Sequence, residues 1–521
     1  NFDILKKEGD SMKHILRIIL YIFNVFVKIT IFFLSLALQI YVLWLSIYSV
    51  PHYYPLYIAT VGISIIPIVY IFNSSNNASY KMSWIILILG LPIVGMIMYL
   101  FFGQGRSFSK KRAKKLKEYV LPYVQKNDAL LYLRHNTDRK IANLLHSTSR
   151  LPFFIDDEVS FLNDGALWFE KMMEDISKAK KYVFLEYFIF SDGETLERLS
   201  SLLIQKAQEG VQIKIILDDI GSKKGLKQKT IDRLKTHPNL KVFSFNPMGM
   251  FFSLNLNFRN HRKITIIDGE VAYCGGTNIA DEYVHKKDRF GYWRDNACRY
   301  AGNAVNSFVF TFCIDWFMSA KEQLNMNEYF KEHPTPTNQE NFICPFSDGP
   351  GDDDNPGYTL FRSMIENAKY SIYISTPYFI IDREFICSLE NAAKSGIDVR
   401  LLIPHIPDKK IPYIMTYYHV GRLIKSGVKV YRYTPGFTHA KNIIIDDRYT
   451  FNGTFNLDYR SLFLHFECGA FHINKELAKE MKTDFHQALK QSRQISYQEW
   501  KKRPLYYRIV EFLGSLFAPL L

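Results

Sequence analysis

Residues 261–278, HRKITIIDGEVAYCGGTN, recur with the same spacing at residues 439–456, HAKNIIIDDRYTFNGTFN. In each copy a His is followed two residues later by a Lys, and an Asp stands five residues after the Lys. The β-branched run between them predicts a strand, on which residues two apart share one face. A Gly-rich turn then leads to an Asn, 17 residues after the His in both copies. The repeat predicts a duplicated unit whose two halves face each other across one site.

Composition limits the kind of protein. At 521 residues, the chain exceeds one ordinary domain, so two core-forming units with additional segments are expected. A formal net charge of +14 together with 48% hydrophobic residues favours a packed protein that meets an anionic partner, either nucleic acid or acidic lipid. Six cysteines show no CxxC pair and no metal-type spacing, so they are interpreted as reduced core thiols.

The N-terminal region is expected to be membrane-embedded. Residues 1–11 are polar and are expected to be a leader outside the fold. Residues 29–49 and 83–102 are apolar runs long enough to cross a bilayer, whereas residues 57–72 are marginal at 16 residues. No polar helical face crosses these runs, which argues against buried soluble helices. We therefore predict transmembrane helices within residues 12–105.

Positive charge flanks this region on both sides and predicts its topology. Such flanks favour an even number of crossings with both ends cytoplasmic, and the number of spans stays at two to four. Residues 106–150 are expected to be a basic juxtamembrane helical linker at anionic headgroups. The flanking residues are Lys13, Arg17 and Lys28 before the first run, and Arg106, Lys110, Lys111, Arg112, Lys114, Lys115 and Lys117 after the last.

Strand and helix patterns alternate in the remainder of the chain. The alternation predicts an α/β sandwich with a mixed sheet in each of two halves, residues 151–333 and 340–498. The stretch PTPTNQ, residues 334–339, is the predicted linker between the halves. Residues 499–521 form an amphipathic tail. Its apolar face is expected to be either a docking stripe on the core or an interfacial membrane anchor.

The paired motifs resemble a known family. HxKxxxxD followed by GxxN, twice in one chain, is similar to the signature of the phospholipase D superfamily. The flanking stretches YWRD at 292–295, TPYF at 376–379 and GTFNLD at 453–458 resemble those of bacterial cardiolipin synthases. The resemblance implies two pseudo-symmetric phospholipase D-like α/β/α sandwich halves, preceded by N-terminal transmembrane helices. It also implies a membrane phosphatidyltransferase that condenses two phosphatidylglycerol molecules into cardiolipin and glycerol.

The motif residues suit phosphoryl chemistry. Lysine supplies a point charge and asparagine an amide N–H to a phosphate, while one imidazole attacks phosphorus and the other carries the leaving group's proton. The resemblance suggests His261 as nucleophile, through a phosphohistidine, and His439 as acid/base. It also places the acceptors that orient the imidazoles at Asp295 and Glu467. The candidate catalytic residues are His261, Lys263, Asp268, His439, Lys441 and Asp446, with Asn278 and Asn456 at the phosphate.

Within that set, Asp268 and Asp446 are interpreted as structural, because their offset from the lysines directs them off the active face. Glu186 has no equivalent in the repeat, since it aligns near Pro377.

Neither a metal nor a cofactor is expected. The expected partners are phosphatidylglycerol and anionic membrane lipids, with no nucleic acid. The expected location is the cell membrane, multi-pass, with the catalytic part on the cytoplasmic side. The alternatives are a phospholipase D or phosphodiesterase hydrolase, and a catalytically inactive lipid-binding scaffold, which the intact His and Lys of both motifs argue against.

Overall fold

The computed structural model describes residues 27, 30–45, 50–74, 77–103, 110–123, 127–155, 157–247, 258–334, 340–350 and 354–517. The chain divides into two compact units. The smaller contains residues 1–107, and the larger contains residues 108–246 and 258–515. The predicted leader at 1–11, most of the interdomain linker and the basic residues Lys13, Arg17, Lys28 and Arg106 lie outside the described residues.

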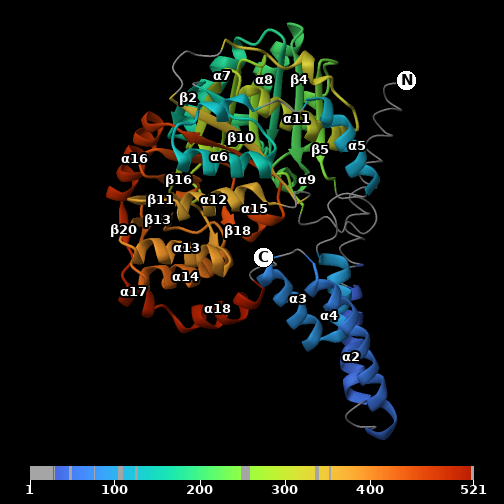
Figure 1. Ribbon diagram of the computed structural model, residues 1–521. Helices are drawn as coiled ribbons and strands as arrows, with labels where there is room; N and C mark the ends of the chain where they lie inside the picture. The colour runs from blue at the N-terminus through green and yellow to red at the C-terminus, as the bar shows by residue number, and fades with distance from the viewer. Residues whose placement is uncertain are drawn as a thin grey trace, which may run out of the picture. The chain divides into compact units, whose positions relative to one another are not determined.

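The larger unit contains two mixed sheets whose strand orders repeat (Figure 1). In chain order, β3, β4, β6, β7 and β9 of the first sheet correspond to β11, β13, β16, β17 and β19 of the second. The first sheet runs β2 (Glu158–Leu162), β9 (Ala297–Ala301), β7 (Val271–Gly275), β6 (Lys263–Ile267), β3 (Tyr182–Tyr187), β4 (Gln212–Asp218) and β5 (Leu240–Phe245). The second runs β1 (Phe154–Ile155), β10 (Phe342–Asp348), β19 (Glu467–Ile473), β17 (Tyr449–Gly453), β16 (Asn442–Ile445), β11 (Ser371–Ser375), β13 (Asp398–Pro404), β14 (Lys429–Tyr433) and β20 (Ser492–Gln494).

Each sheet combines parallel and antiparallel pairs. In the first sheet, β3, β4 and β5 are parallel, and β6 is antiparallel to β3. The equivalent strands of the second sheet pair in the same way. Every residue of β3 and of β11 is buried, as expected for strands covered on both faces. The predicted mixed sheets in two repeated halves are therefore confirmed.

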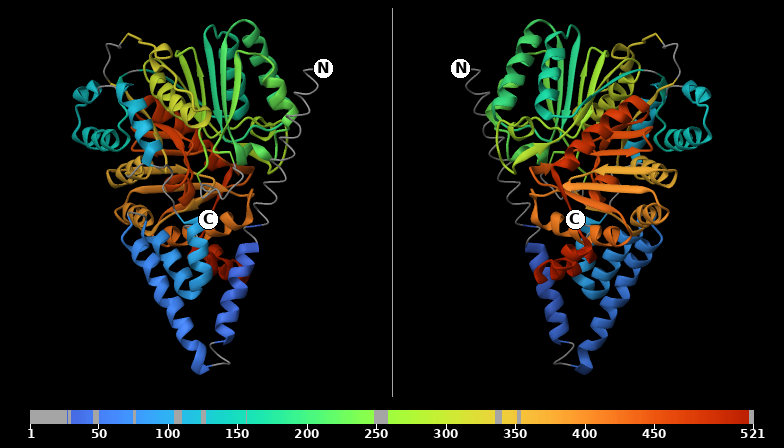
Figure 2. Two further views of the ribbon diagram at one scale, coloured as in Figure 1. Left: turned by 90° about the vertical axis from the view of Figure 1, so that its right-hand side faces the viewer. Right: turned by 90° about the vertical axis from the view of Figure 1, so that its left-hand side faces the viewer.

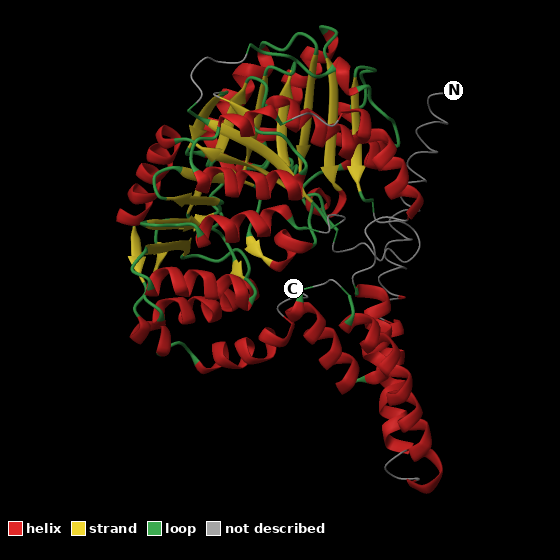
Figure 3. Ribbon diagram, viewed as in Figure 1, coloured by secondary structure: helices red, strands yellow, loops and turns green. Residues whose placement is uncertain are grey.

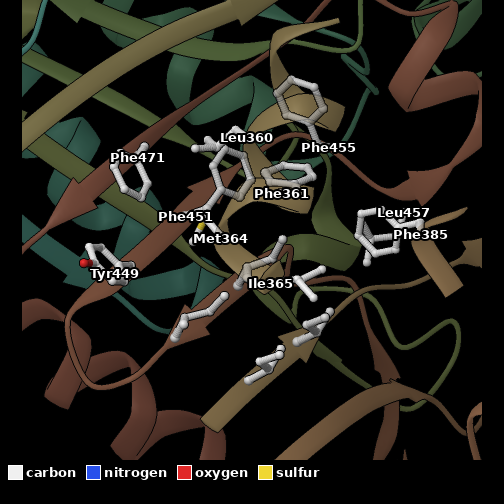
Figure 4. Packing of buried hydrophobic residues seen from close by; sticks show 14 of the residues in the cluster. Leu360, Phe361, Met364, Ile365, Phe385, Tyr449, Phe451, Phe455, Leu457 and Phe471 are labelled. Carbon is white, nitrogen blue, oxygen red and sulfur yellow. The ribbon is translucent and has the colours of Figure 1, made fainter. Parts of the chain in front are cut away.

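Helices cover the sheets, as the red and yellow layers of the larger unit show (Figure 3). Helices α7 (Gly165–Ser177) and α8 (Glu194–Gln208) pack on the first sheet, and α12 (Pro356–Glu366) and α13 (Arg383–Lys394) pack on the second. Figure 4 shows Phe361 and Met364 of α12 against Phe451 of β17 and Phe471 of β19. Close packing of this kind supplies most of the stability of each half.

One hydrophobic core joins the two halves. Helix α11 (Val305–Ala320) contributes Phe308, Phe312 and Trp316 to it, and α16 (Lys475–Lys490) contributes Met481 and Phe485. Buried residues of both sheets belong to the same cluster. Figure 2 shows the two sheets and these helices from two opposite sides. The halves are thus one folded body, which fixes the motif strands relative to each other.

Two segments N-terminal to the first sheet belong to the second half. Strand β1, which the sequence assigned to the first half, extends the second sheet by pairing with β10. Helix α6 (Asn136–Ser149), within the predicted basic linker, buries Ile141 and Leu145 in the core of the second half. Its Asp138 also forms a buried ion pair with Arg448. Within the described part of 106–150, α5 (Lys110–Val120) is the basic helix, with exposed Lys114, Lys115 and Lys117.

The smaller unit contains helices that are apolar but interrupted. Residues 30–45 are helical, and α2 (Val50–Phe72), α3 (Ala78–Gly90) and α4 (Pro92–Phe102) follow. The run at 83–102 is split at Leu91, because Pro92 cannot donate a helical hydrogen bond. The buried Gln39 side chain accepts the free N–H of Ile93 at 3.0 Å. Among the helices that the structure describes, none is both long and apolar enough to cross a membrane, so the predicted spans are not confirmed.

These helices expose many large apolar side chains. Leu34, Ile66, Tyr70, Phe72 and Leu100 are each more than 60% exposed. Water-soluble monomers rarely expose contiguous apolar surface on this scale.

The C-terminal helix α18 (Leu505–Phe517) has one packed face and one exposed face. Tyr507 stacks on Tyr417 of α14 (Lys410–Lys425), and Glu511 forms a buried ion pair with Arg503. Ile509 and Phe512 are exposed. The helix therefore docks on the core and also presents an apolar surface.

Candidate active site

The two motifs begin central strands of their sheets. Lys263 is the first residue of β6, and Lys441 directly precedes β16, so the strands begin at or after the lysines rather than at the histidines. Both lysine side chains and both histidine side chains are buried. The central position of β6 and β16 places these four side chains in the interior of the larger unit.

Each motif histidine contacts a carboxylate from the opposite half. His261 Nδ1 lies 2.9 Å from Glu467 Oε1 and 3.0 Å from Oε2, and Glu467 begins β19 of the second sheet. His439 Nδ1 lies 2.7 Å from Asp295 Oδ2, and Asp295 follows β8 (Tyr292–Arg294) of the first half. The two halves therefore exchange orienting groups. The resemblance named Asp295 and Glu467 as the acceptors, each downstream of one motif, but it did not indicate that each would serve the histidine of the opposite half.

Backbone hydrogen bonds repeat the same exchange. The N–H of His261 donates to Phe466 O at 2.9 Å, and that of His439 donates to Arg294 O at 2.7 Å. Each acceptor is the residue immediately before the orienting carboxylate. In addition, β15 (Gly436–Thr438) pairs with β8 across the halves. The two motifs are thus tied into the opposite half by main chain and by side chain.

The carboxylates select one tautomer of each imidazole. Burial acts to raise the pKa of Glu467, but the charge and hydrogen bonding of His261 outweigh it and hold that pKa well below its usual range. The pKa of Asp295 is also lowered, because the charge of His439 outweighs burial there. An ionised carboxylate only accepts, so Nδ1 of each histidine carries the proton and Nε2 keeps its lone pair. Both imidazoles can therefore act as nucleophile or base through Nε2.

Burial and neighbouring cations lower the pKa of the basic groups. Desolvation lowers the pKa of His261 to about 3 and that of His439 to about 4. Desolvation also lowers the pKa of Lys263 to about 8 and that of Lys441 to about 7. Lys441 interacts electrostatically with Lys263, Asp295 and Glu467, so the two motif sets share one electrostatic environment.

The lysines have unused donor capacity. Lys263 Nζ donates to His261 O and Lys441 Nζ donates to His439 O, each at 2.5 Å. Among the residues that the structure describes, neither ammonium has a salt-bridge partner within 4.0 Å. An ammonium has three donors, and a buried cation is unfavourable unless those donors find acceptors. Two such cations beside two imidazoles offer donors of the kind that a phosphate group accepts.

The comparisons with known proteins agree with this geometry. Residues 172–289 and 361–489 each match the family described as cardiolipin synthase, phospholipase D-like domain, and residues 62–104 match the phospholipase D-nuclease N-terminal family. The chain is 35% identical over 470 residues to the major cardiolipin synthase of Bacillus subtilis, an alignment that covers 88% of this chain and 97% of that protein. The chain belongs to the cardiolipin synthase family.

Further relatives extend the comparison. Cardiolipin synthase 1 of Staphylococcus aureus strain MRSA252 is 34% identical over 466 residues, covering 87% of this chain and 94% of that protein. The crystal structure of phosphatidylserine synthase from Haemophilus influenzae aligns with a TM-score of 0.58 at 18% identity, covering 73% of this chain and 97% of that one. The likeness to the Haemophilus influenzae phosphatidylserine synthase supports the fold alone.

The two family-motif asparagines are placed differently. Asn278 is held by protein at both ends of its amide, because its Oδ1 accepts from Ile189 N at 3.0 Å and its Nδ2 donates to the Tyr283 hydroxyl at 2.8 Å. The ring of Tyr283 lies 5.5 Å from that of His439. Asn456 is also buried, but its Oδ1 has no hydrogen-bond partner. An amide oxygen only accepts, so this open position does not by itself favour an anionic phosphate.

The motif aspartates serve the fold. Asp268 accepts the N–H groups of Lys180, Lys181 and Tyr182 at 2.7, 2.8 and 2.7 Å, just where β3 begins. Asp446 does the same at the start of β11. Both have positive φ, 54° and 53°. Although they complete the family motif, these two side chains are fully engaged with backbone amides, which agrees with their structural interpretation.

Sequence reasoning missed the residues that hold Glu467. The hydroxyl of Ser461 donates to Oε1 at 2.6 Å, and that of Thr454 donates to Oε2. The residue equivalent to Thr454 in the first motif is Gly276, where an added Cβ would lie 2.1 Å from Asp295 Oδ1. Comparing the turns GGTN and GTFN position by position would have revealed this difference. The shorter Asp295 side chain packs against Gly276, whereas the longer Glu467 side chain accepts hydrogen bonds from the hydroxyls of Thr454 and Ser461.

Glu186 also lies behind the first motif. Its carboxyl group is fully buried in β3, and burial together with the neighbouring Asp315 raises its pKa well above the usual value. Asn260, adjacent to His261, donates to it. Because the repeat has no equivalent of this acid, the two halves differ in the layer that supports the motif.

Proposed function

We propose that this chain is a membrane-associated phosphatidyltransferase that condenses two phosphatidylglycerol molecules into cardiolipin and glycerol. The observation that carries the proposal is the exchange of orienting carboxylates: His261 with Glu467, and His439 with Asp295. Two imidazoles with free Nε2 lone pairs and two cations suit a double displacement at one phosphorus. The family relatives named as cardiolipin synthases support the choice of substrate.

In the first step, Nε2 of His261 attacks the phosphodiester of one phosphatidylglycerol. The N–P bond forms, the P–O bond to glycerol breaks, and His439 gives its Nε2 proton to the leaving oxygen. In the second step, a hydroxyl of another phosphatidylglycerol returns a proton to His439 and attacks phosphorus, and the N–P bond breaks. The second step thereby regenerates both histidines.

His439 must gain a proton before it can act as an acid. In the ligand-free site, desolvation and the charge of Lys441 lower its pKa to about 4. A bound phosphodiester adds negative charge beside the imidazole and offsets the two lysine charges, so substrate raises the affinity of His439 for that proton. The same lysines then stabilise the additional charge on the phosphoryl oxygens in the transition state.

Three surfaces support membrane association. The helices of the smaller unit expose large apolar side chains, and we propose that they lie in the bilayer as a multi-pass anchor. The exposed Lys114, Lys115 and Lys117 of α5 suit anionic headgroups on the cytoplasmic side. The exposed Ile509 and Phe512 of α18 suit the interfacial region.

The test uses purified full-length protein in vesicles whose lipid is phosphatidylglycerol alone, with cardiolipin, free glycerol and phosphatidic acid measured together. The proposal predicts cardiolipin and glycerol in equal amounts, with both lost in His261→Ala and in His439→Ala. Phosphatidic acid as the main product would show a hydrolase instead. Absence of any phospholipid turnover by the folded protein would reject enzymatic function on this lipid.

A further inference from the structure

A third histidine lies beside the first motif. The ring of His465 is 5.6 Å from the ring of His261, and its Nδ1 lies 3.8 Å from Glu467 Oε1. Its side chain is 13% exposed, and its buried Nδ1 has no hydrogen-bond partner. One ligand atom from each of His261, His465 and Glu467 lies within 4.8 Å of the others. Two imidazoles and a carboxylate thus converge, and each offers an atom that can bind a metal ion.

The opposite half provides an internal comparison. His465 stands two residues before Glu467, and the residue two before Asp295 is Trp293. The ring of Trp293 lies 5.4 Å from His439, much as His465 lies from His261. An indole N–H is a donor only and cannot bind a metal, so the second motif offers two ligands where the first offers three. The two halves therefore differ at this position, where His465 can bind a metal ion and Trp293 cannot.

We infer that His261, His465 and Glu467 form a binding site for a borderline divalent cation such as Zn²⁺. Two imidazoles with one carboxylate are a common zinc ligand set, and three protein ligands leave a coordination position open. The oxygens of Glu467 are already fixed by the hydroxyls of Thr454 and Ser461, which reduces the reorganisation that binding requires. The linear sequence hides the set, because His261 is more than 200 residues from its partners.

The bound cation is an inhibitor rather than a cofactor, a consequence that rests on the proposed function. If the metal takes Nδ1 of His261, it displaces that proton to the buffer and removes the orienting hydrogen bond to Glu467. If it takes Nε2, it occupies the lone pair that attacks phosphorus. In both cases metal binding and phosphatidyl transfer exclude each other.

Binding is tested without activity. Full-length protein in lipid-free detergent micelles is cleared of metal with a chelator and titrated with Co²⁺, whose visible absorption reports low-coordinate N/O ligation. The expected result is a signal that saturates at one equivalent and is displaced by Zn²⁺. Removing one ligand with His465→Asn or His465→Gln should weaken Co²⁺ binding by at least ~10-fold. Wild-type protein that gives no such signal would overturn the site.

His285→Asn is the matched control. His285 also contacts a carboxylate, Asp164, at 2.7 Å, but it lies outside the motifs. This variant should bind Co²⁺ like the wild type. Equal binding by the His465 variants and the wild type would place the metal elsewhere and overturn the assignment.

Inhibition is then measured as the ratio of cardiolipin formation with and without Zn²⁺ for each variant, so differences in basal rate cancel. Wild type and His285→Asn should be inhibited at the concentration that saturates the Co²⁺ site, and the His465 variants should require at least ~10-fold more Zn²⁺. Binding of Co²⁺ without inhibition by Zn²⁺ would reject the inhibitory role while leaving the phosphatidyltransferase proposal intact. Turnover that is lost on metal removal and restored by Zn²⁺ would overturn the inhibitory role. Absence of turnover both with and without metal would instead reject the proposed function.

Discussion

Glu467 of the second half holds Nδ1 of His261 of the first half at 2.9 Å, and so one half supplies the reacting imidazole while the other fixes its tautomer. The reciprocal contact between His439 and Asp295 makes neither half complete alone. This mutual dependence explains why the halves share one core through α11 and α16.

Removing either orienting charge should reduce turnover strongly. Glu467→Gln and Asp295→Asn keep side-chain size but no longer enforce the Nδ1–H tautomer, and a comparable change in a hydrolase triad costs about 10⁴-fold in rate. We expect losses of ~10³–10⁴-fold in cardiolipin formation, measured in vesicles. Asp164→Asn, which removes the carboxylate beside the non-motif His285, should retain activity. A loss below ~10-fold in both site variants would contradict the orienting role.

The lysines should contribute to the transition state more than to membrane association. Lys263→Ala and Lys441→Ala each remove one cation aimed at the phosphoryl oxygens, which typically costs about 3 kcal/mol or ~10²-fold in turnover. Vesicle co-sedimentation should be unchanged, since both side chains are buried. Reduced sedimentation at normal turnover per bound enzyme would assign the lysines to lipid binding instead.

The same lysines should lower the stability of the folded chain. Their folded-state pKa values, about 8 and about 7, lie below the ordinary 10.5, so at neutral pH the folded state carries the penalty of keeping them protonated. This penalty is present below the folded pKa and disappears as the pH rises past 10.5. Lys263→Met and Lys441→Met should therefore raise Tm by at least ~2 °C while lowering turnover by ~10²-fold, as in the alanine variants.

Lys214 is the matched control for that experiment. It is equally buried, in β4, and desolvation lowers its pKa to about 8, but it lies against Phe184 and Trp316 rather than at the motifs. Lys214→Met should keep catalytic activity. An unchanged or lower Tm in both motif variants would show that the buried lysine charges do not destabilise the folded state.

Activity should fall as pH rises through 7 to 8. In the free enzyme, Lys441 loses its proton near pH 7 and Lys263 near pH 8, and each loss weakens phosphate binding. The profile of kcat/KM should decline across this window. In Lys441→Arg the part of the decline near pH 7 should disappear, because the guanidinium group stays charged. A profile that rises from pH 7 to 9 in the wild type would contradict the assignment.

The repeat allowed much of the fold to be predicted, because the strand pattern around each motif is local. The motif spacing likewise singled out His261, Lys263, His439 and Lys441, whose catalytic role stays a prediction. Other features depend on long-range contacts that no local pattern contains. Helix α6 looked like a linker because its buried Ile141 and Leu145 contact residues more than 200 positions later. The split at Leu91 was foreseeable from Pro92, but the Gln39 contact that supports it was not.

The most direct test of the central claim, a phosphatidyl group held on a histidine and passed to an alcohol, is exchange of labelled glycerol. The intermediate has released glycerol but kept phosphatidate, so added glycerol should capture it and regenerate phosphatidylglycerol. We predict that label enters phosphatidylglycerol, that excess glycerol lowers the net yield of cardiolipin, and that phosphatidic acid remains a minor product. Phosphatidic acid as the dominant product, with no label in phosphatidylglycerol, would contradict the account.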